Sequence, residues 1–319
     1  MLSPGFWRVA VAWLLAMLLG GGLAAAAVLA PARNIAVLFP DIGEPSRAVF
    51  ARIIEGIEDQ AKGRVTSIAV GANPNQQDIV AELRRQDVRV VIALGRNGLK
   101  VAGSLEHDIG VVVGGIVTVP EPELRNFTVS SLAPDPALLL ARLLGFKPAT
   151  KRVFVVYDPV QNGWLMRLAR SAATARGIEL VAREATDLKA ALQHYQSILS
   201  TMDAGKDALW LPLDTTTAQE ATVLPLVLQE AWGRNLAVFS SNVAHVRRGA
   251  LFSLYPNNLE VGRNLADHAL RHLASGAPPQ RGVMPLKNVQ LAVNVRTAAH
   301  LGIDVAGKQS SFDLVFPEQ

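Results

Sequence analysis

The sequence of 319 residues contains no cysteine. This absence excludes disulfide bonds, thiolate nucleophiles and cysteine-ligated metal sites. It also excludes anchoring through a lipid-modified N-terminal cysteine. Whatever holds the fold together must therefore be a large hydrophobic core, and any chemistry must come from the remaining side chains.

Clustered charge and catalytic motifs are also missing. Lys and Arg exceed Asp and Glu by 31 to 27, but the cations are dispersed, so the basic stripe or aromatic platform of a nucleic-acid partner is absent. No G-x-G-x-x-G, Walker or G-x-S-x-G pattern occurs. His268 and His272 have metal-ligand spacing, yet the glutamate of H-E-x-x-H is missing and their neighbours are polar. We therefore expect no enzyme activity, no cofactor, no bound metal and no nucleic acid.

The N-terminal segment, by contrast, carries a strong pattern. Arg8 precedes the apolar stretch "VAVAWLLAMLLGGGLAAAAVLA", and an Ala-x-Ala exit follows it. This order is typical of a secretory signal peptide, which we place at residues 1–32. A retained membrane anchor is the alternative, because 9–30 is long enough to approach a span. An exported chain without disulfides fits the bacterial periplasm, where disulfides are permitted but not required.

From residue 34 onward, short apolar runs alternate with longer segments of helical period. The runs are continuous in apolar residues, which is typical of parallel strands covered on both faces. Regular alternation of strand and helix predicts an α/β fold of doubly wound parallel sheets. The predicted strands are 35–39, 65–70, 90–94, 111–115, 153–157, 179–182, 208–211 and 236–240, and the predicted helices are 45–61, 75–87, 160–176, 187–203 and 217–233.

A proline-containing seam at 126–152 separates two such series, and a late strand–helix–strand piece near the C-terminus indicates that the chain returns to the first half. We therefore predict two Rossmann-like lobes joined by several crossings, with a ligand cleft between them. The predicted N-terminal lobe comprises 33–131 plus about 256–290, and the predicted C-terminal lobe comprises 132–255 plus about 291–319.

The candidate binding residues follow the predicted strands, because doubly wound sheets bind ligands beyond the carboxyl ends of their strands. The loops there, such as "PDIGEP", "GRNG", "DPVQNG", "PLDTTT" and "SSNVAH", are rich in hydrogen-bonding side chains and poor in nucleophiles. The candidates are Asp41, Glu44, Arg96, Asn97, Tyr157, Asp158, Asn162, Asp214, Thr215, Ser241, Asn242 and Tyr255.

Several candidates also have a purely structural interpretation. Asp41 and Glu44 have the positions of acids that complement a helix N-terminus. Asp214 is equally an N-cap or a carboxylate for a ligand ammonium or hydroxyl. The glycines of "GRNG" are explained by a tight turn, while Arg96 remains a candidate carboxylate clamp. Tyr157, together with Trp164 and Tyr255, is a candidate for stacking on a flat ligand.

The chain resembles the substrate-binding proteins of ABC transporters that have a type I periplasmic-binding fold. The resemblance covers residue 34 to about residue 305. It is carried by "NFTVSSLAPDPALLLARLL…KPATKRVFVVYDP", "GALFSLYPNNLEVGRNLADHALRHLASGAPP" and "LAVNVRTAAHLGIDV". The sequence departs from the family at Val129, where a glycine is usual, and in the first loop, "PDIGEPSR".

This resemblance implies a monomeric periplasmic binder that closes on a small polar or aromatic, amino-acid-like metabolite and delivers it to an ABC permease in the inner membrane. A second hypothesis is an exported two-lobed sensor or accessory protein of a signalling or outer-membrane receptor system. A periplasmic enzyme is a third class, but the sequence offers no catalytic constellation for it.

Overall fold

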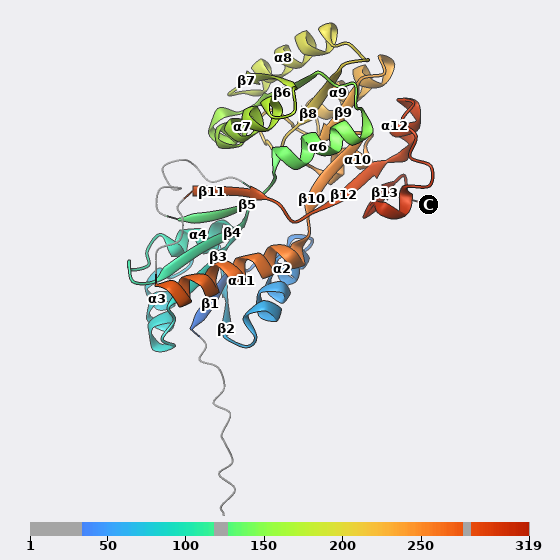
Figure 1. The fold of residues 1–319 in the computed structure, drawn as a ribbon. Helices are drawn as coiled ribbons and strands as arrows, with labels where there is room; N and C mark the ends of the chain where they lie inside the picture. Colours follow the sequence, from blue (N-terminus) through green and yellow to red (C-terminus); the bar gives the residue numbers. More distant parts are fainter. Residues whose placement is uncertain (1–33, 118–126, 277–281, 319) are drawn as a thin grey trace, which may run out of the picture. The chain divides into compact units, whose positions relative to one another are not determined.

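The computed structural model describes residues 34–117, 127–276 and 282–318. The predicted signal peptide lies outside these residues, as does most of the loop after residue 117. Residues Arg33–Gln319 form one compact unit that contains two α/β sheets (Figure 1). Within the described residues, no helix combines the length and apolar character needed to cross a membrane.

The first sheet has six strands in the order β11-β5-β4-β3-β1-β2, and all its pairings are parallel. Its strands are β1 (Ile35–Pro40), β2 (Val65–Val70), β3 (Val90–Leu94), β4 (Gly110–Ile116), β5 (Thr128–Pro134) and β11 (Gly282–Leu286). The helices that belong with it are α2 (Ser46–Ala61), α3 (Gln76–Arg85), α4 (Gly95–Ala102) and α11 (Asn258–Ser275).

The second sheet has seven strands in the order β13-β12-β10-β9-β8-β6-β7, and only the pairing of β10 with β12 is antiparallel. Its strands are β6 (Arg152–Tyr157), β7 (Glu179–Glu184), β8 (Asp207–Leu211), β9 (Ala237–Ser240), β10 (Phe252–Pro256), β12 (Val289–Asn294) and β13 (Leu314–Phe316). Its helices are α6 (Pro136–Phe146), α7 (Pro159–Thr174), α8 (Leu188–Thr201), α9 (Val223–Gly233), α10 (Val243–Arg247), α12 (Val295–His300) and the 3-10 turn Gln309–Ser311.

Both faces of each sheet are covered, which explains the continuous apolar runs in the sequence. In β1, Ala36 and Leu38 pack into one core cluster, while Ile35 and Val37 pack into a different one, because alternate side chains point to opposite faces. All four are fully buried. The predicted fold of doubly wound, mostly parallel sheets is confirmed.

Two local predictions were wrong. The segment "GRNG" is the first turn of helix α4 rather than an isolated turn, and a Cβ at Gly98 would lie 2.9 Å from the carbonyl oxygen of Leu38. Gly98 is thus required for close packing of the helix on β1. Helix α9 begins at Val223 rather than 217, because Thr217 donates its hydroxyl to the carbonyl of Val156 and the intervening residues form turns.

Within the described residues, three chain crossings connect the two sheets, and hydrogen bonds join these crossings to one another. The crossings follow β5, β10 and β11 in chain order. The backbone N–H of Asp135, in the first crossing, donates to the carbonyl of Leu286 at 2.8 Å. The N–H of Asn257, in the second, donates to the carbonyl of Asn288 at 3.1 Å. The third crossing, Lys287 and Asn288, is therefore tied at its ends to the other two.

Helices α2 and α11, which are far apart in the chain, lie against each other at glycine positions (Figure 1). A Cβ added to Gly262 of α11 would collide with the backbone carbonyl of Ile53 in α2. A Cβ added to Gly56 of α2 would likewise collide with the carbonyl of Leu259 in α11. The two helix backbones are in direct contact at these points.

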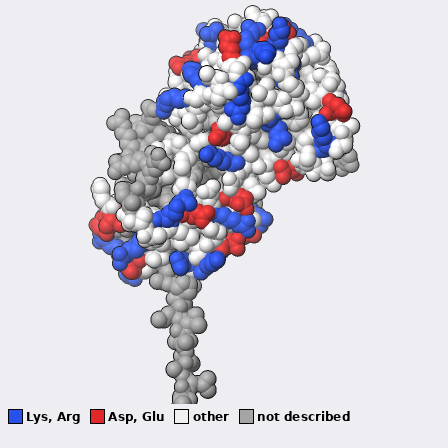
Figure 2. All heavy atoms as spheres, viewed as in Figure 1, with Lys and Arg blue, Asp and Glu red and all other residues white. Residues whose placement is uncertain are grey.

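Charged side chains of both signs are interspersed over the face of the molecule drawn in Figure 2. Several of them form pairs, such as Arg263 with Asp59 at 2.7 Å and Arg247 with Glu318 at 3.0 Å. Exposed pairs of this kind contribute little to stability. On this face, cations and anions are mixed rather than separated into single-sign patches.

Candidate functional site

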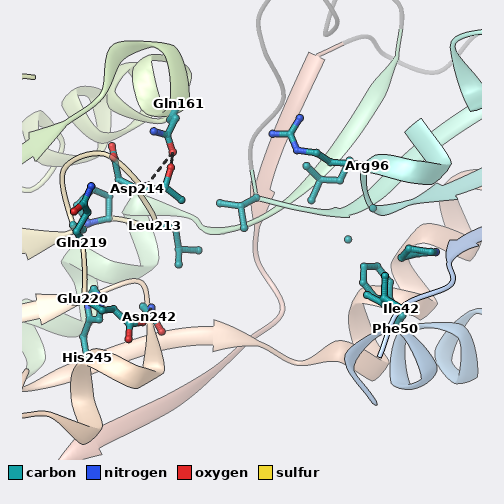
Figure 3. Close-up of a pocket in the computed structure, with 18 of the residues that line it drawn as sticks. Ile42, Phe50, Arg96, Gln161, Leu213, Asp214, Gln219, Glu220, Asn242 and His245 are labelled. Carbon is teal, nitrogen blue, oxygen red and sulfur yellow. Dashed lines mark hydrogen bonds between the residues drawn. The ribbon is translucent and has the colours of Figure 1, made fainter. Parts of the chain in front are cut away.

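A cleft of about 890 Å³ is lined by loops from both sheets. On the first sheet, its wall follows the carboxyl ends of β1, β3 and β4. On the second sheet, its wall consists mainly of the loop after β8, with contributions from the starts of α7 and α10. Figure 3 shows Ile42, Phe50 and Arg96 on one side of the cleft and Gln161, Asp214 and Glu220 among the residues on the other.

The first wall is largely apolar and is built around Phe50 of α2. The Phe50 ring lies against two glycines at the ends of β3 and β4, Gly95 and Gly115, which both have positive φ (67° and 66°). A Cβ at Gly115 would lie 2.9 Å from the Phe50 ring. Because neither glycine carries a side chain, the ring occupies the space over both strand ends. Together with Pro40 and Ile42 it gives the cleft an apolar surface.

Among the described residues of this wall, Arg96 carries the charge. It is exposed, it lines the cleft, and the described residues provide its side chain with neither a salt bridge nor a hydrogen bond. Its neighbour Asn97 instead donates its side-chain amide to the carbonyls of Val70 and Gly71, which ties α4 to the end of β2. Arg96 is therefore held on a fixed helix start with its guanidinium donors available to a ligand.

On the opposite wall, Asp214 organises the loop after β8. One carboxylate oxygen accepts the backbone N–H groups of Thr216 and Thr217, at 2.9 and 2.8 Å. The other accepts the backbone N–H of Asp158 at 2.7 Å and the amide of Asn162 at 2.9 Å. A carboxylate has about four acceptor sites, so these donors use its capacity. The structure thus favours the structural interpretation of Asp214 over a free carboxylate for a ligand.

A second network joins the start of α7 to the same loop. Asp158 caps the helix by accepting from the N–H of Val160 at 2.8 Å, and it also accepts from Thr216 and Gln161. Burial alone would raise the pKa of Asp158, but the hydrogen bonds from Thr216 and Gln161 and from the backbone outweigh it and lower the pKa below its ordinary value. Gln161 in turn accepts from the backbone and hydroxyl of Thr215. The loop is therefore rigidly positioned.

Glu220 provides the accessible negative charge of this wall. Its carboxylate accepts from the Asn242 amide at 3.2 Å and lies 3.6 Å from Arg248, and its side chain is 45% exposed. The Arg248 guanidinium also donates to the backbone carbonyl of Glu220. Because Glu220 is paired only loosely and is open to solvent, its carboxylate retains capacity for a cationic ligand group.

His245 lines the cleft and is 2% exposed. The Ser240 hydroxyl has one proton, and the carbonyl of Leu211, 3.0 Å away, can only accept it. The 2.9 Å contact between Ser240 Oγ and His245 Nδ1 is then a hydrogen bond donated by the imidazole. Nε2 is left as an acceptor that has no partner among the described residues. Burial, together with Arg248 and against the effect of Glu220, lowers the pKa of His245 to about 4, so the ring is neutral at pH 7.

The structure brings part of the predicted site together. Five of the candidates line the cleft: Arg96, Asn97, Asp214, Thr215 and Asn242. The others do not line it. Asp41 and Glu44 are exposed in the loop after β1, where Glu44 accepts from the N–H of Ala48. Asp158, Asn162 and Ser241 are buried supports, the last accepting from the indole of Trp210.

The candidate aromatic wall lies elsewhere as well. Tyr157 is 3% exposed and donates its hydroxyl to Glu184 at 2.6 Å, on the side of β7. Trp164 packs in the core of the second lobe. Tyr255 is half-buried against the core beside β12. The aromatic ring that does line the cleft is Phe50, which sequence reasoning missed because it lies in the amphipathic pattern of a helix.

Other cleft residues had weak signals. Gln161 and His245 were within the predicted loops but were not singled out, and Glu220 was not among the candidates. Gln219 and Leu213 had no distinguishing signal. Groups of His, Asp and Glu that could hold a metal ion are absent from the described residues.

Comparison with known proteins gives a family and a fold. The family model described as "ABC transporter substrate binding protein" matches residues 140–310. No curated protein matches the sequence.

Solved structures match over most of the chain. A ligand-free, open substrate-binding protein with adhesive properties from Clostridium difficile is 17% identical, covers 86% of this chain and 97% of its own, and has a TM-score of 0.61. A conserved domain protein from Vibrio cholerae is 20% identical (89% and 99% covered, TM-score 0.53). An ABC domain from Streptococcus pneumonia in complex with L-Trp is 16% identical (88% and 99%, TM-score 0.52). At these identities the likeness shows the fold.

Proposed function

Because the chain belongs to the family of ABC transporter substrate-binding proteins, we propose that it binds a small amino-acid-like metabolite in the cleft and presents it to an ABC permease. We further propose that a signal peptide at residues 1–32 directs export and that the protein acts as a monomer in the periplasm, without a catalytic step. We propose that the N-terminal lobe comprises 33–131 plus about 256–290 and the C-terminal lobe 132–255 plus about 291–319. The assignment of the strands to the two sheets supports this division.

The ligand class is supported by Arg96, which has no partner among the described residues, on one wall opposite the loosely paired Glu220 on the other (Figure 3). An amino acid carries a carboxylate, an ammonium group and a side chain. Arg96 complements the carboxylate through charge-assisted hydrogen bonds, and Glu220 with Asn242 complements the ammonium. The Phe50 ring and Ile42 provide an apolar surface for the side chain.

Closure of the lobes gives this arrangement its function. Contacts from both walls to one small molecule form only when the walls approach, so ligand binding stabilises the closed state by that differential affinity. The three crossings are the place for the rotation, because few residues connect the sheets there. A permease then distinguishes the loaded from the empty protein by the arrangement of the lobes.

The test is a thermal-shift screen of the purified protein against the common L-amino acids, with sugars and nucleobases as comparison classes. One amino acid is expected to raise the melting temperature, since a ligand at 100 times its Kd stabilises by about 2.7 kcal/mol. A shift with a sugar or nucleobase alone would overturn the ligand class. The absence of any shift would overturn the binding function and favour an accessory role.

The role of Arg96 is tested with the ligand found in this screen. We expect Arg96→Gln to weaken binding roughly 10- to 100-fold, which corresponds to the loss of hydrogen bonds to a charged group, about 1.5–3 kcal/mol. Arg64→Gln is the matched control, because Arg64 is exposed on the same lobe and does not line the cleft. Isothermal titration of the three proteins makes the measurement. Equal affinities of Arg96→Gln and the wild type would contradict the assignment.

A further inference from the structure

A second cavity, of about 260 Å³, lies beside the third crossing. We call it the hinge pocket. It is lined by β5, α11, β11 and the two crossing residues, Lys287 and Asn288. It is slightly smaller than the usual range of about 300–1,000 Å³ for pockets that bury drug-sized ligands, so its size suits a small ion or molecule.

Five of the six polar side chains that line the hinge pocket have no hydrogen-bond partner among the described residues; the sixth, Ser131, donates to the carbonyl of Val117 and accepts from the N–H of Ala133. Ser130 of β5, Asn264 and His268 of α11, and Lys287 and Asn288 of the crossing all line it. For none of these five side chains do the described residues provide a hydrogen bond or a salt bridge. Each of these five side chains can donate a hydrogen bond. The donors are the hydroxyl of Ser130, the amides of Asn264 and Asn288, the ammonium of Lys287 and, in either tautomer, the imidazole of His268.

The charge of the hinge pocket is positive. Lys287, which is exposed, is the cation among the described residues that line it, and none of those residues is Asp or Glu. The acids of the neighbouring α11 are already engaged: Asp267 accepts from Gln60 at 2.5 Å, and Glu260 pairs with Arg263. A ligand that accepts several hydrogen bonds and carries negative charge complements this set, whereas a cation does not.

The position of the pocket relates it to the hinge. Leu286 and Asn288, on either side of Lys287, accept the backbone hydrogen bonds that tie the other two crossings to this one. Ser130 and Asn264, in contrast, belong to elements of the first lobe. An ion that contacts the crossing residues Lys287 and Asn288 as well as Ser130 and Asn264 would hold the third crossing against β5 and α11.

We propose that the hinge pocket binds a small oxyanion, of the size and charge of inorganic phosphate, and that the bound anion restrains the third crossing. The anion accepts hydrogen bonds from the Lys287 ammonium, from the amides of Asn264 and Asn288 and from the Ser130 hydroxyl. The site is separate from the cleft, and the proposal does not depend on the identity of the cleft ligand.

The experiment uses inorganic phosphate as the probe, added to the purified protein at constant ionic strength against chloride. Melting temperature and titration calorimetry are measured for the wild type, Lys287→Gln and Lys189→Gln. Lys189 is an exposed lysine of α8 that lines neither pocket, so its substitution makes the same charge change elsewhere. Phosphate is expected to stabilise the wild type and Lys189→Gln, and its affinity is expected to fall about tenfold or more in Lys287→Gln.

Two results would overturn the proposal. One is the absence of a phosphate effect on the wild type, and the other is an equal effect on wild type and Lys287→Gln. Arg96→Gln is included because phosphate bound in the cleft would depend on Arg96 rather than on Lys287. If the phosphate effect is lost in Arg96→Gln but kept in Lys287→Gln, the anion binds in the cleft and not in the hinge pocket. The proposal for the hinge pocket then fails, and the proposed function of the cleft is unaffected.

Discussion

Replacement of Gly262 by alanine is expected to lower the free energy of unfolding by about 3 kcal/mol or more, the upper part of the range for overpacking. A Cβ at this position would collide with the backbone carbonyl of Ile53, and a backbone cannot rotate away as a flexible side chain does. Helices α2 and α11 would therefore have to separate. Separation would expose the cluster that contains Ile53, Ile57 and Leu265, all fully buried.

The matched control for this prediction is Gly163→Ala. Gly163 also lies inside a helix, α7, but a Cβ there meets nothing within 4 Å. Alanine is favoured over glycine in a helix interior by about 0.5–1 kcal/mol, so this variant should be slightly more stable than the wild type. Urea denaturation of the three proteins checks both values. If the two alanine variants unfold at the same urea concentration, the close helix contact is not what stabilises this part of the fold.

Acidification from pH 6.5 to pH 4 is expected to cost the protein about 3 kcal/mol of stability through His245 alone. The pKa of His245 is lowered from 6.5 to about 4, chiefly by burial. Between these values the unfolded chain binds a proton that the folded chain does not. The free energy of unfolding therefore increases as the pH rises from 4 to 6.5 and decreases as the pH falls through the same range.

The comparison variant is His245→Gln, whose amide can still hydrogen-bond to Ser240 but does not titrate. Its stability should depend less steeply on pH between 4 and 6.5 than that of the wild type, whatever its absolute stability. Some slope should remain, because burial and then Arg271 lower the pKa of His268 as well. Urea unfolding at several pH values measures the slopes, and parallel slopes for the two proteins would contradict a buried neutral His245.

The fold class could be predicted from the sequence because strands that are buried on both faces of a sheet consist of consecutive apolar residues. Strands such as β1 and β3 are continuous apolar runs in the chain, since each of their faces packs against a different core cluster. The family resemblance was confirmed by the family match at residues 140–310. The absence of cysteine likewise excludes disulfide bonds and thiolate chemistry from the sequence alone, because no fold of the chain can provide a residue type that it lacks.

The strand-end rule also pointed to loops that line the cleft, because parallel strands bring their carboxyl ends to one edge of a sheet. It did not determine which side chains of those loops face the cleft. The binding role of the twelve candidate residues stays a prediction.

Only the tertiary structure decided the direction of each side chain. The carboxylate of Asp214 is engaged within the protein because it accepts the backbone N–H of Asp158, 56 residues away, and the amide of Asn162. Phe50, an ordinary apolar residue of a helix in the sequence, forms the cleft surface because Gly95, at the start of α4, and Gly115 of β4 lie against its ring. Local periodicity records how much of a residue is buried, whereas the partner of a side chain depends on which distant segments the strand order places beside it.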